Sequence, residues 1–382
     1  MKVLYLAHYK EGTGWSRAAI DYIMALDSVG VDVVCRNIKL TNRIGEVPDR
    51  VLELEKKSFD GCTVCIQHIL PHHLVGTRHF DKNIAYFVSE STSIKTTPWF
   101  PQLQQMDEVW VPNSDLQNGL TKDKLFDDSN RIRLVPHTFD LDQYVKSYRQ
   151  IFIESIDHKF KFYFIGEFND RKNLGAIIRS FHSEFDRSEP VALILKVKRY
   201  GFSPKQLTSK VEQLCTEIKK KMRMYPSVAD YHREVIISDE MDNDGINSLH
   251  QYGDCFVCAS HGEGWSIPAF DAMCFENTPI CSAVGGPKDF IGSPETGRCV
   301  NGVYSVCDSV DSAFPEMFTG REEWFVPCEY EMKSFMRYYY TNRDQLTIQR
   351  EHSRVDRTAG LTQADKFSYE NVGNKIKEYL GV

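Results

Sequence analysis

The sequence lacks any hydrophobic run that approaches the roughly 18 residues needed for a membrane-spanning helix. Its first apolar run, within Met1–Ala7, is interrupted by the polar segment His8–Glu11 and is too short for the core of a secretory signal peptide. We therefore expect a soluble, cytoplasmic protein, with peripheral contact to a membrane left open.

The chain also lacks an excess of basic residues and any low-complexity segment. Its 46 Lys and Arg residues are outnumbered by 53 Asp and Glu residues, for a formal net charge of −7. This balance argues against a protein that coats nucleic acid. A chain of 382 residues is longer than one hydrophobic core usually grows, so we expect two domains.

Glycine is too sparse after the expected first strand, residues 1–7, for a dinucleotide-binding fingerprint. Gly12 and Gly14 follow that strand, but the third glycine of Gly-x-Gly-x-x-Gly is missing. Its absence argues against a nicotinamide-dependent dehydrogenase. The loop, with Thr13 between the glycines, precedes an expected helix at Ala18–Leu26, an arrangement that tolerates phosphate. A plain strand-to-helix turn explains the same residues equally well.

The eleven cysteines are an odd number without an export signal, which fits reduced thiols. Two Cys-x-x-Cys pairs, Cys62/Cys65 and Cys255/Cys258, raise the alternative of a zinc site. Each pair lies in a run expected to be a strand, where residues three apart point to opposite faces. We interpret all four as buried core residues and expect no metal site there.

Strand-like apolar runs alternate with helix-like segments at βαβ spacing along the chain, which predicts α/β domains with doubly wound parallel sheets. We expect a first domain at 1–150 and a second at 151–365, with a hinge within 141–158. Periodic patterns also predict a terminal helix at Phe367–Leu380 and a further helix near Arg343–Arg357.

The stretch Cys258–Asp289 carries the strongest functional signal. A buried strand, Asp254–Ala259, leads into the tight turn Gly262-Glu263-Gly264. Pro268 then begins a short helix, because a first helical residue does not need its N–H group. A second strand ends at the pair Gly285-Gly286. Open α/β sheets bind ligands at the carboxyl ends of their strands, where this turn is expected.

The turn offers two kinds of binding group. Backbone N–H groups at the helix start, backed by the positive end of the helix dipole, suit a phosphate. These groups belong to Gly264, Trp265, Ser266 and Ile267. Glu263 and Asp271 would repel a phosphate, but their carboxylates accept hydrogen bonds from the vicinal hydroxyls of a ribose or a hexose. A sugar nucleotide carries both kinds of group.

Glu263 and Asp271, with seven residues between them, resemble the Glu-seven-Glu motif of retaining glycosyltransferases of the GT-B fold, especially glycosyltransferase family 4. That motif usually reads Glu-Gly-Phe-Gly-Leu-Pro and ends on Glu. Here Trp265 replaces Phe, Ser266 replaces the second Gly, and Asp271 is one methylene shorter than Glu. The resemblance implies two Rossmann-like domains facing across a cleft, with the C-terminal helix, 366–382, crossing back to the first.

The resemblance also implies roles for residues of the second domain. The family often has Arg just after a strand-ending glycine and Lys five residues later, and this chain has Glu167 and Lys172 at those places. Lys172 is therefore expected to stabilise the departing diphosphate. Arg171 either replaces the missing Arg or faces solvent. Glu263 is expected to hold the sugar, Asp271 the ribose, and Gly285 and Gly286 to line the donor site.

In the first domain, the resemblance places the Gly12-Thr13-Gly14 loop near the donor phosphate and the acceptor. Glu90, after another expected strand, is either an acceptor-side group or base, or a helix-cap residue. Two Asp-x-Asp triplets, Asp140–Asp142 and Asp242–Asp244, match a metal-binding pattern of the other, GT-A class. Their surroundings do not fit that class, so we expect no metal role.

These features predict a metal-independent glycosyltransferase that uses a UDP- or GDP-sugar donor as co-substrate and needs no cofactor, and the family resemblance implies that it retains the anomeric configuration. The acceptor is not identified and could be a glycan, a lipid, a protein or a nucleic-acid base. One alternative is a GT-B protein that binds a nucleotide sugar without transferring it, which the departures at Glu167, Ser266 and Asp271 support. A second alternative is a sugar-nucleotide epimerase on the same fold.

Overall fold

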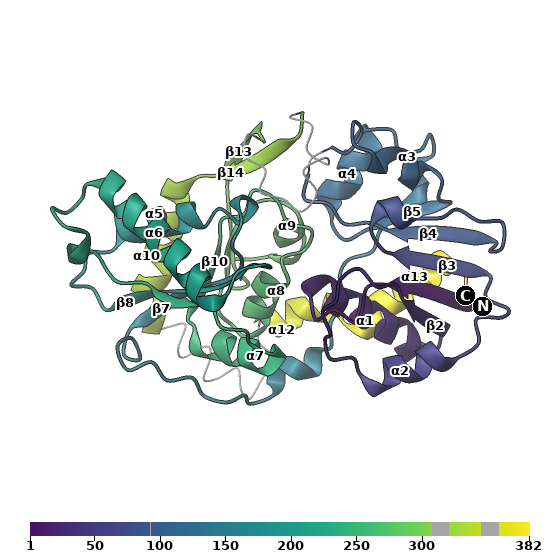
Figure 1. Cartoon of the computed structure of the whole chain (residues 1–382), viewed down its shortest axis with the longest axis horizontal. Helices are drawn as coiled ribbons and strands as arrows, with labels where there is room; N and C mark the ends of the chain where they lie inside the picture. Colours follow the sequence, from purple (N-terminus) through teal and green to yellow (C-terminus); the bar gives the residue numbers. More distant parts are fainter. Residues whose placement is uncertain (92, 308–320, 345–358) are drawn as a thin grey trace. The chain divides into compact units, whose positions relative to one another are not determined.

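The computed structural model describes residues 1–91, 93–307, 321–344 and 359–382. These residues divide into two compact units (Figure 1). The first unit contains 1–91, 93–141, 321–323 and 364–382, and the remaining described residues form the second. The division after residue 141 lies at the start of the segment in which the sequence analysis places a hinge.

The first unit is built on a six-stranded parallel sheet in the order β2-β1-β3-β4-β5-β6 (Figure 1). Its strands are β1 (Lys2–Ala7), β2 (Asp32–Asn37), β3 (Val64–His68), β4 (Lys82–Tyr86), β5 (Glu108–Val111) and β6 (Ile132–Leu134). Its helices are α1 (Gly14–Ser28), α2 (Asp49–Lys56), α3 (Trp99–Gln104), α4 (Ser114–Lys122) and α13 (Tyr369–Leu380), with short 3-10 turns at Pro71–His73, Ser129–Arg131 and Asp365–Phe367.

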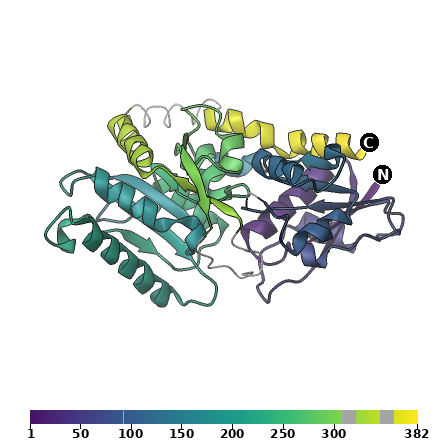
Figure 2. The same ribbon diagram turned by 90° about the horizontal axis from the view of Figure 1, so that it is seen from above.

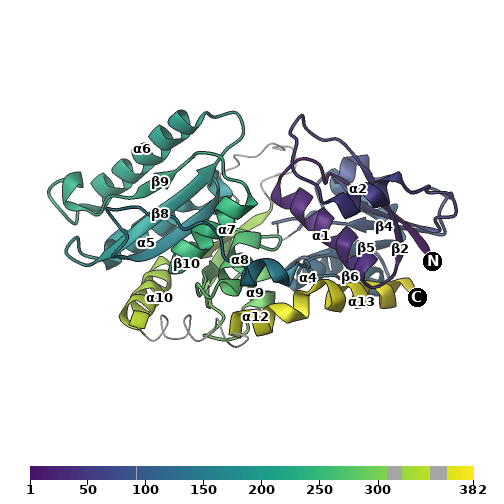
Figure 3. The same cartoon turned by 90° about the horizontal axis from the view of Figure 1, so that it is seen from below.

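The C-terminal helix α13 belongs to the first unit, although the second unit precedes it in the chain. Its apolar residues Val372, Ile376 and Leu380 join the core that Ile23 and Leu26 of α1 help to form. Figure 3 shows α13 running along this unit. Burial of one apolar stripe of an amphipathic helix explains why the segment docks here. The predicted return of the last helix to the first domain is confirmed.

The second unit has its own six-stranded parallel sheet, in the order β12-β11-β10-β7-β8-β9. Its strands are β7 (Phe160–Glu167), β8 (Val191–Lys198), β9 (Val235–Ile237), β10 (Cys255–Cys258), β11 (Ile280–Ser282) and β12 (Arg298–Val300), and a separate pair is formed by β13 (Gly302–Val306) and β14 (Glu323–Pro327). The helices are α5 (Leu174–Glu184), α6 (Pro204–Met222), α7 (Asn243–Tyr252), α8 (Ile267–Cys274), α9 (Gly286–Phe290), α10 (Glu329–Thr341) and α12 (Ala359–Ala364), with 3-10 turns at Leu141–Val145, Asp170–Lys172 and Val228–Asp230.

Helices α10, α5 and α6 pack side by side on one face of this second sheet (Figure 2). Their inward residues, such as Ile177, Val211 and Met336, share one core with Phe162 and Leu193 of the central strands. Parallel strands buried on both faces need nearly continuous apolar sequences, which β7 and β8 provide. The predicted doubly wound α/β architecture is confirmed in both units. The helix expected near 343–357 falls mostly outside the described residues.

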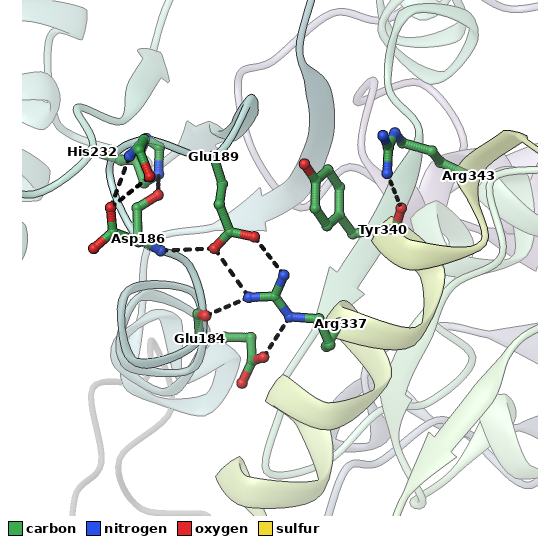
Figure 4. A network of polar contacts seen from close by, with 8 residues as sticks. Glu184, Asp186, Glu189, His232, Arg337, Tyr340 and Arg343 are labelled. Carbon is green, nitrogen blue, oxygen red and sulfur yellow. Dashed lines mark hydrogen bonds and ion pairs between the residues drawn. The ribbon is translucent and has the colours of Figure 1, made fainter.

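A polar network fastens α10 to the end of α5 (Figure 4). The guanidinium of Arg337 donates to the Glu184 side chain at 2.7 Å, to the Glu184 carbonyl at 2.7 Å and to both carboxylate oxygens of Glu189. The same guanidinium lies 4.6 Å from the centre of the Phe185 ring. Arg337 therefore binds two carboxylates. It also binds the Glu184 carbonyl, and carbonyls at the C-terminus of a helix have no partner within the helix.

Replacing Arg337 by methionine should lower the free energy of unfolding of the second unit by about 1–2 kcal/mol, since the side chain is partly solvent-exposed and its charge is screened. Urea denaturation would measure the change. Arg343→Met is the matched control, because it removes the same charge from a residue that follows α10 and contacts the carbonyl and ring of Tyr340. Equal losses in both variants would contradict the assigned role.

In the part of the chain that the structure describes, no helix is long and apolar enough to cross a membrane.

Candidate functional site

The candidate site of the second unit lies where the strand order of its sheet reverses. From β7 the chain adds β8 and β9 on one side, and then returns to add β10, β11 and β12 on the other. The connections that follow β7 and β10 therefore lead to strands on opposite sides of this point, and ligands of open α/β sheets bind in the crevice at such a point. Lys172 follows β7, and Glu263 follows β10.

The two loops meet through a short ion pair. Lys172 Nζ lies 2.6 Å from Glu263 Oε1, and Arg171 Nη1 lies 3.6 Å from Glu263 Oε2. Arg171 also donates to the carbonyl of Gly262 at 2.7 Å, while the backbone N–H of His261 donates to the carbonyl of Arg171 at 2.8 Å. Arg171 thus connects the two loops. The structure brings together the three residues predicted to be catalytic.

Glu263 is buried and ionised. Burial by itself would raise the pKa of this carboxyl group, but the charges of Lys172 and Arg171 and hydrogen bonds from Lys172 and Ser260 lower the pKa to about 2. A buried carboxylate that stays charged is a strong acceptor for hydroxyl groups. Its stabilising contribution is present above the ordinary pKa near 4.5 and is lost as the pH falls toward 2.

The predicted Gly285-Gly286 pair lies directly against the Glu263 turn. A Cβ atom on Gly285 would lie 1.8 Å from the carbonyl oxygen of Glu263, and one on Gly286 would lie 2.4 Å from that of Trp265. Gly285 also has a positive φ of 65°. Only glycine combines this backbone conformation with such a close approach. These two residues therefore set the position of the Glu263 backbone.

Helix α8 begins within the same turn. Ser266, the residue before it, has φ 67°, a left-handed conformation in which glycine carries no steric penalty. This geometry explains why the motif that the turn resembles has glycine at that place. Trp265 is buried, with its ring 5.4 Å from that of Phe290, so its side chain serves packing. Gly264 and Ile267 complete the turn, where the positive end of the helix dipole lies.

Asp271, predicted to hold a ribose, lies on α8 and is buried. Its Oδ1 accepts a hydrogen bond from the hydroxyl of Tyr144 at 2.6 Å. Tyr144 belongs to the 3-10 turn Leu141–Val145 and stacks edge-on against Phe275. The sequence analysis missed this contact, since a single tyrosine in a polar segment carries no pattern that points to a partner 127 residues away.

The first unit holds the other predicted group of residues. Gly12 has φ 61°, Thr13 caps α1 by accepting from the N–H of Ser16, and Gly14 is the first residue of that helix. They lie beyond the carboxyl end of β1, next to which the strand order of this sheet also reverses. Glu90 is partly buried on the loop after β4, two strands away from β1.

A cluster of aromatic rings that the sequence analysis missed lies beside the Gly12 loop. His8 follows β1, His68 ends β3, and Trp15 lies in the first turn of α1, with its ring centre 5.6 Å from that of His8 and 5.9 Å from that of His68. Among the described residues, His8 Nε2, Trp15 Nε1 and His68 Nε2 have no hydrogen-bond partner although they are buried. Burial lowers the pKa of both histidines, so both are neutral.

Over residues 1–91, 93–307, 321–344 and 359–382, no group of three or more His, Cys, Asp or Glu side chains is arranged to hold a metal ion. Cys62, Cys65, Cys255 and Cys258 are all buried, in agreement with their interpretation as core residues.

Residues 149–309 match the family model described as "Glycosyl transferases group 1". No curated protein sequence matches the chain. The domain match confirms the predicted glycosyltransferase, while assignment to family 4 in particular stays a prediction.

Several solved structures share the fold over the whole chain. HepE of Anabaena in complex with UDP-glucose is 12% identical, with a TM-score of 0.65 over 100% of this chain and 99% of that one. Sucrose-phosphate synthase of Thermosynechococcus elongatus is 13% identical, with a TM-score of 0.61 and 100% and 98% coverage. A trehalose-6-phosphate structure from E. coli bound with UDP-2-fluoro glucose is 10% identical, with a TM-score of 0.66 and 100% and 99% coverage. The likeness confirms the predicted GT-B fold.

Proposed function

We propose, on the premise that residues 149–309 are a glycosyl transferases group 1 domain within a GT-B fold, that the protein transfers a sugar from a nucleotide-sugar donor to an acceptor hydroxyl. The transfer proceeds with retention of the anomeric configuration and without a metal ion. The donor is a UDP- or GDP-sugar bound by the second unit. UDP-glucose in the similar HepE structure supports a donor of this class.

The pairing of Lys172 with Glu263 at the reversal point of the sheet carries the proposal. An ammonium group has three N–H donors, so its bond to Glu263 does not exhaust its capacity for a phosphate oxygen. Lys172, together with the N-terminal end of α8, stabilises the diphosphate as it departs. Glu263 holds the sugar hydroxyls. Asp271 binds the ribose, whose hydroxyls replace the hydrogen bond from the Tyr144 hydroxyl.

The acceptor-side groups of the proposal lie in the first unit. Neutral His8 donates through Nδ1 to the carbonyl of Ile38, so its Nε2 is an acceptor. The indole N–H of Trp15 is a donor. An acceptor and a donor beside the Gly12 loop suit an uncharged hydroxyl group, which can both donate and accept. Glu90 remains a candidate acceptor-side group in this proposal.

A thermal-shift panel tests the proposal directly. A nucleoside diphosphate or sugar nucleotide that binds the folded protein should raise its melting temperature, since saturation at 100 times Kd stabilises by about 2.7 kcal/mol. The panel includes UDP, GDP, ADP and their glucose or mannose conjugates. The matching nucleosides are the control, because they lack the diphosphate that Lys172 would bind. If no nucleoside diphosphate or sugar nucleotide changes the melting temperature, the proposed donor site is contradicted.

A transfer assay with the best donor then tests metal independence. Activity should be the same with EDTA and with added Mg²⁺, because a fixed cation replaces the metal at the diphosphate. Loss of activity in EDTA, restored by a divalent cation, would contradict this part of the proposal.

Binding without transfer is the second candidate function, and the Tyr144 bond to Asp271 favours it. That bond occupies one oxygen of the carboxylate proposed to hold the ribose. Release of nucleoside diphosphate from the donor, even by slow hydrolysis, separates the two candidates, because a pure binding protein would leave the donor intact.

A further inference from the structure

Three cysteines lie side by side across neighbouring strands of the second unit. The register of the sheet pairs Cys258 of β10 with Cys281 of β11, and Cys281 with Cys299 of β12. Residues paired in this way project from the same face of a sheet. Cys258 and Cys281 are fully buried neighbours, whereas Cys299 is partly exposed.

Cys258 also contacts the candidate site. Its thiol donates to Glu263 Oε1 at 3.6 Å and lies 3.2 Å from the hydroxyl of Ser260. Cys258 is the last residue of β10, five positions before Glu263, so the strand end and the turn form one short segment. A covalent bond that pulls this sulfur and the end of β10 toward β11 therefore also moves the Glu263 carboxylate and its backbone.

We propose that Cys258 and Cys281 form a reversible oxidation site, in which a peroxide joins the two sulfurs as a disulfide and thereby disables the Glu263 site. The effect on the site rests on the proposed function, whereas disulfide formation does not.

The chemistry is balanced by one equivalent of hydrogen peroxide. The Cys258 thiolate attacks one peroxide oxygen, the O–O bond breaks, and the products are a sulfenic acid on Cys258 and hydroxide, which takes up a proton to give water. The Cys281 sulfur then attacks the Cys258 sulfur, an S–S bond forms, and a second water leaves. Two electrons pass from the thiol pair to the peroxide.

The order of these steps follows from the two environments. The pKa of Cys258 is lowered to about 7, with the neighbouring Cys281 side chain as the largest cause and the Lys172 charge acting in the same direction, against the effects of burial and of the Glu263 charge. Burial raises the pKa of Cys281 well above its ordinary value. Since the thiolate is the reactive species, Cys258 is the sulfur that peroxide oxidises first.

The sheet geometry makes the disulfide strained and therefore easy to reduce. Neighbouring strands are about 4.8 Å apart, which lies within the Cα separations that disulfides span. Paired side chains leave the sheet nearly in parallel, yet the Cβ atoms of a disulfide are only about 3.8 Å apart. The strands must therefore move together, and strained disulfides of this kind are labile and regulatory. The same movement displaces the Glu263 turn.

Mass spectrometry of the reduced full-length protein after hydrogen peroxide treatment tests the site. Unreacted thiols are alkylated in denaturant before digestion. We expect one linked pair of peptides, containing Cys258 and Cys281, that dithiothreitol reverses. Cys299→Ser should form the same link. Cys281→Ser, or Cys281→Ala if the first variant folds poorly, should instead retain a sulfenic acid on Cys258 that dimedone traps.

Cys62 and Cys65 are the internal control, because burial raises the pKa of both thiols and places Cys65 near 12. They should remain fully alkylated. Complete alkylation of Cys258 and Cys281 after treatment, or a link between Cys281 and Cys299 in their place, would overturn the proposed site.

The UDP-induced thermal shift tests the effect on the candidate site, with the best nucleotide of the panel run in parallel. Oxidation should abolish the shift, dithiothreitol should restore it, and Cys281→Ser should keep it under the same peroxide dose. A crosslinked protein with an unchanged shift would overturn the disabling role. If the reduced protein shows no shift with any nucleotide, the proposed function fails, while the peptide link still decides the oxidation site.

Discussion

Replacing Lys172 by alanine is expected to reduce kcat/KM for sugar transfer by roughly 10²-fold to 10³-fold, the loss typical when a preorganised charge at a reacting group is removed. Two effects combine in this variant. The diphosphate loses a fixed cation, and Glu263 loses the largest of the interactions that hold its pKa low. Since burial alone raises that pKa, the carboxyl group of the variant binds a proton more readily and accepts hydroxyl groups less well.

A double-mutant cycle measures how far the two residues act together. Lys172→Ala, Glu263→Gln and the double variant should give losses that are far from additive, because the two side chains are in direct contact at 2.6 Å. Arg171→Ala should lose less activity, since its guanidinium lies 3.6 Å from Glu263 and its shorter bond goes to the Gly262 carbonyl. Melting temperatures of all variants show whether each remains folded. Full activity of Lys172→Ala on the correct donor and acceptor would remove the mechanism.

Gly285→Ala is expected to lower the free energy of unfolding of the second unit by about 3–5 kcal/mol, at the upper end of effects for single substitutions. The new Cβ would lie 1.8 Å from the Glu263 carbonyl oxygen, which is backbone and cannot rotate away. The positive φ adds a further penalty for any residue with a Cβ. The Glu263 turn must therefore move, and nucleotide binding should fall as well.

Gly201→Ala is the matched control in the same unit. Gly201 has φ 82°, yet a Cβ there would meet no atom within 4 Å. Its variant should therefore show the conformational penalty alone, about 1–2 kcal/mol. Urea denaturation gives the free energy of unfolding of both variants, and the difference between their two losses is the effect of the steric overlap. Equal destabilisation would show that the close approach of Gly285 to the Glu263 turn has no energetic importance.

Much of the candidate site could be predicted because its signals are local. A buried strand, a glycine turn and a proline at a helix start lie within the short stretch 254–268, and the structure has β10 and α8 there. The two alternatives for Arg171 could not be separated in this way. The structure shows that its guanidinium bonds the Gly262 carbonyl and does not face only solvent, while a role in place of the missing Arg stays a prediction.

The sequence by itself determined which segments become strands and helices and which turns carry acid, cation and glycine, because hydrophobic periodicity and turn chemistry act over a few residues. Only the tertiary structure decided which of these segments became neighbours. The strand order places β10 beside β7 and β11 beside β10, which pairs Lys172 with Glu263 across 91 positions and sets Cys258 opposite Cys281. Such contacts depend on how whole strands pair in a sheet, and no local sequence pattern predicts that pairing.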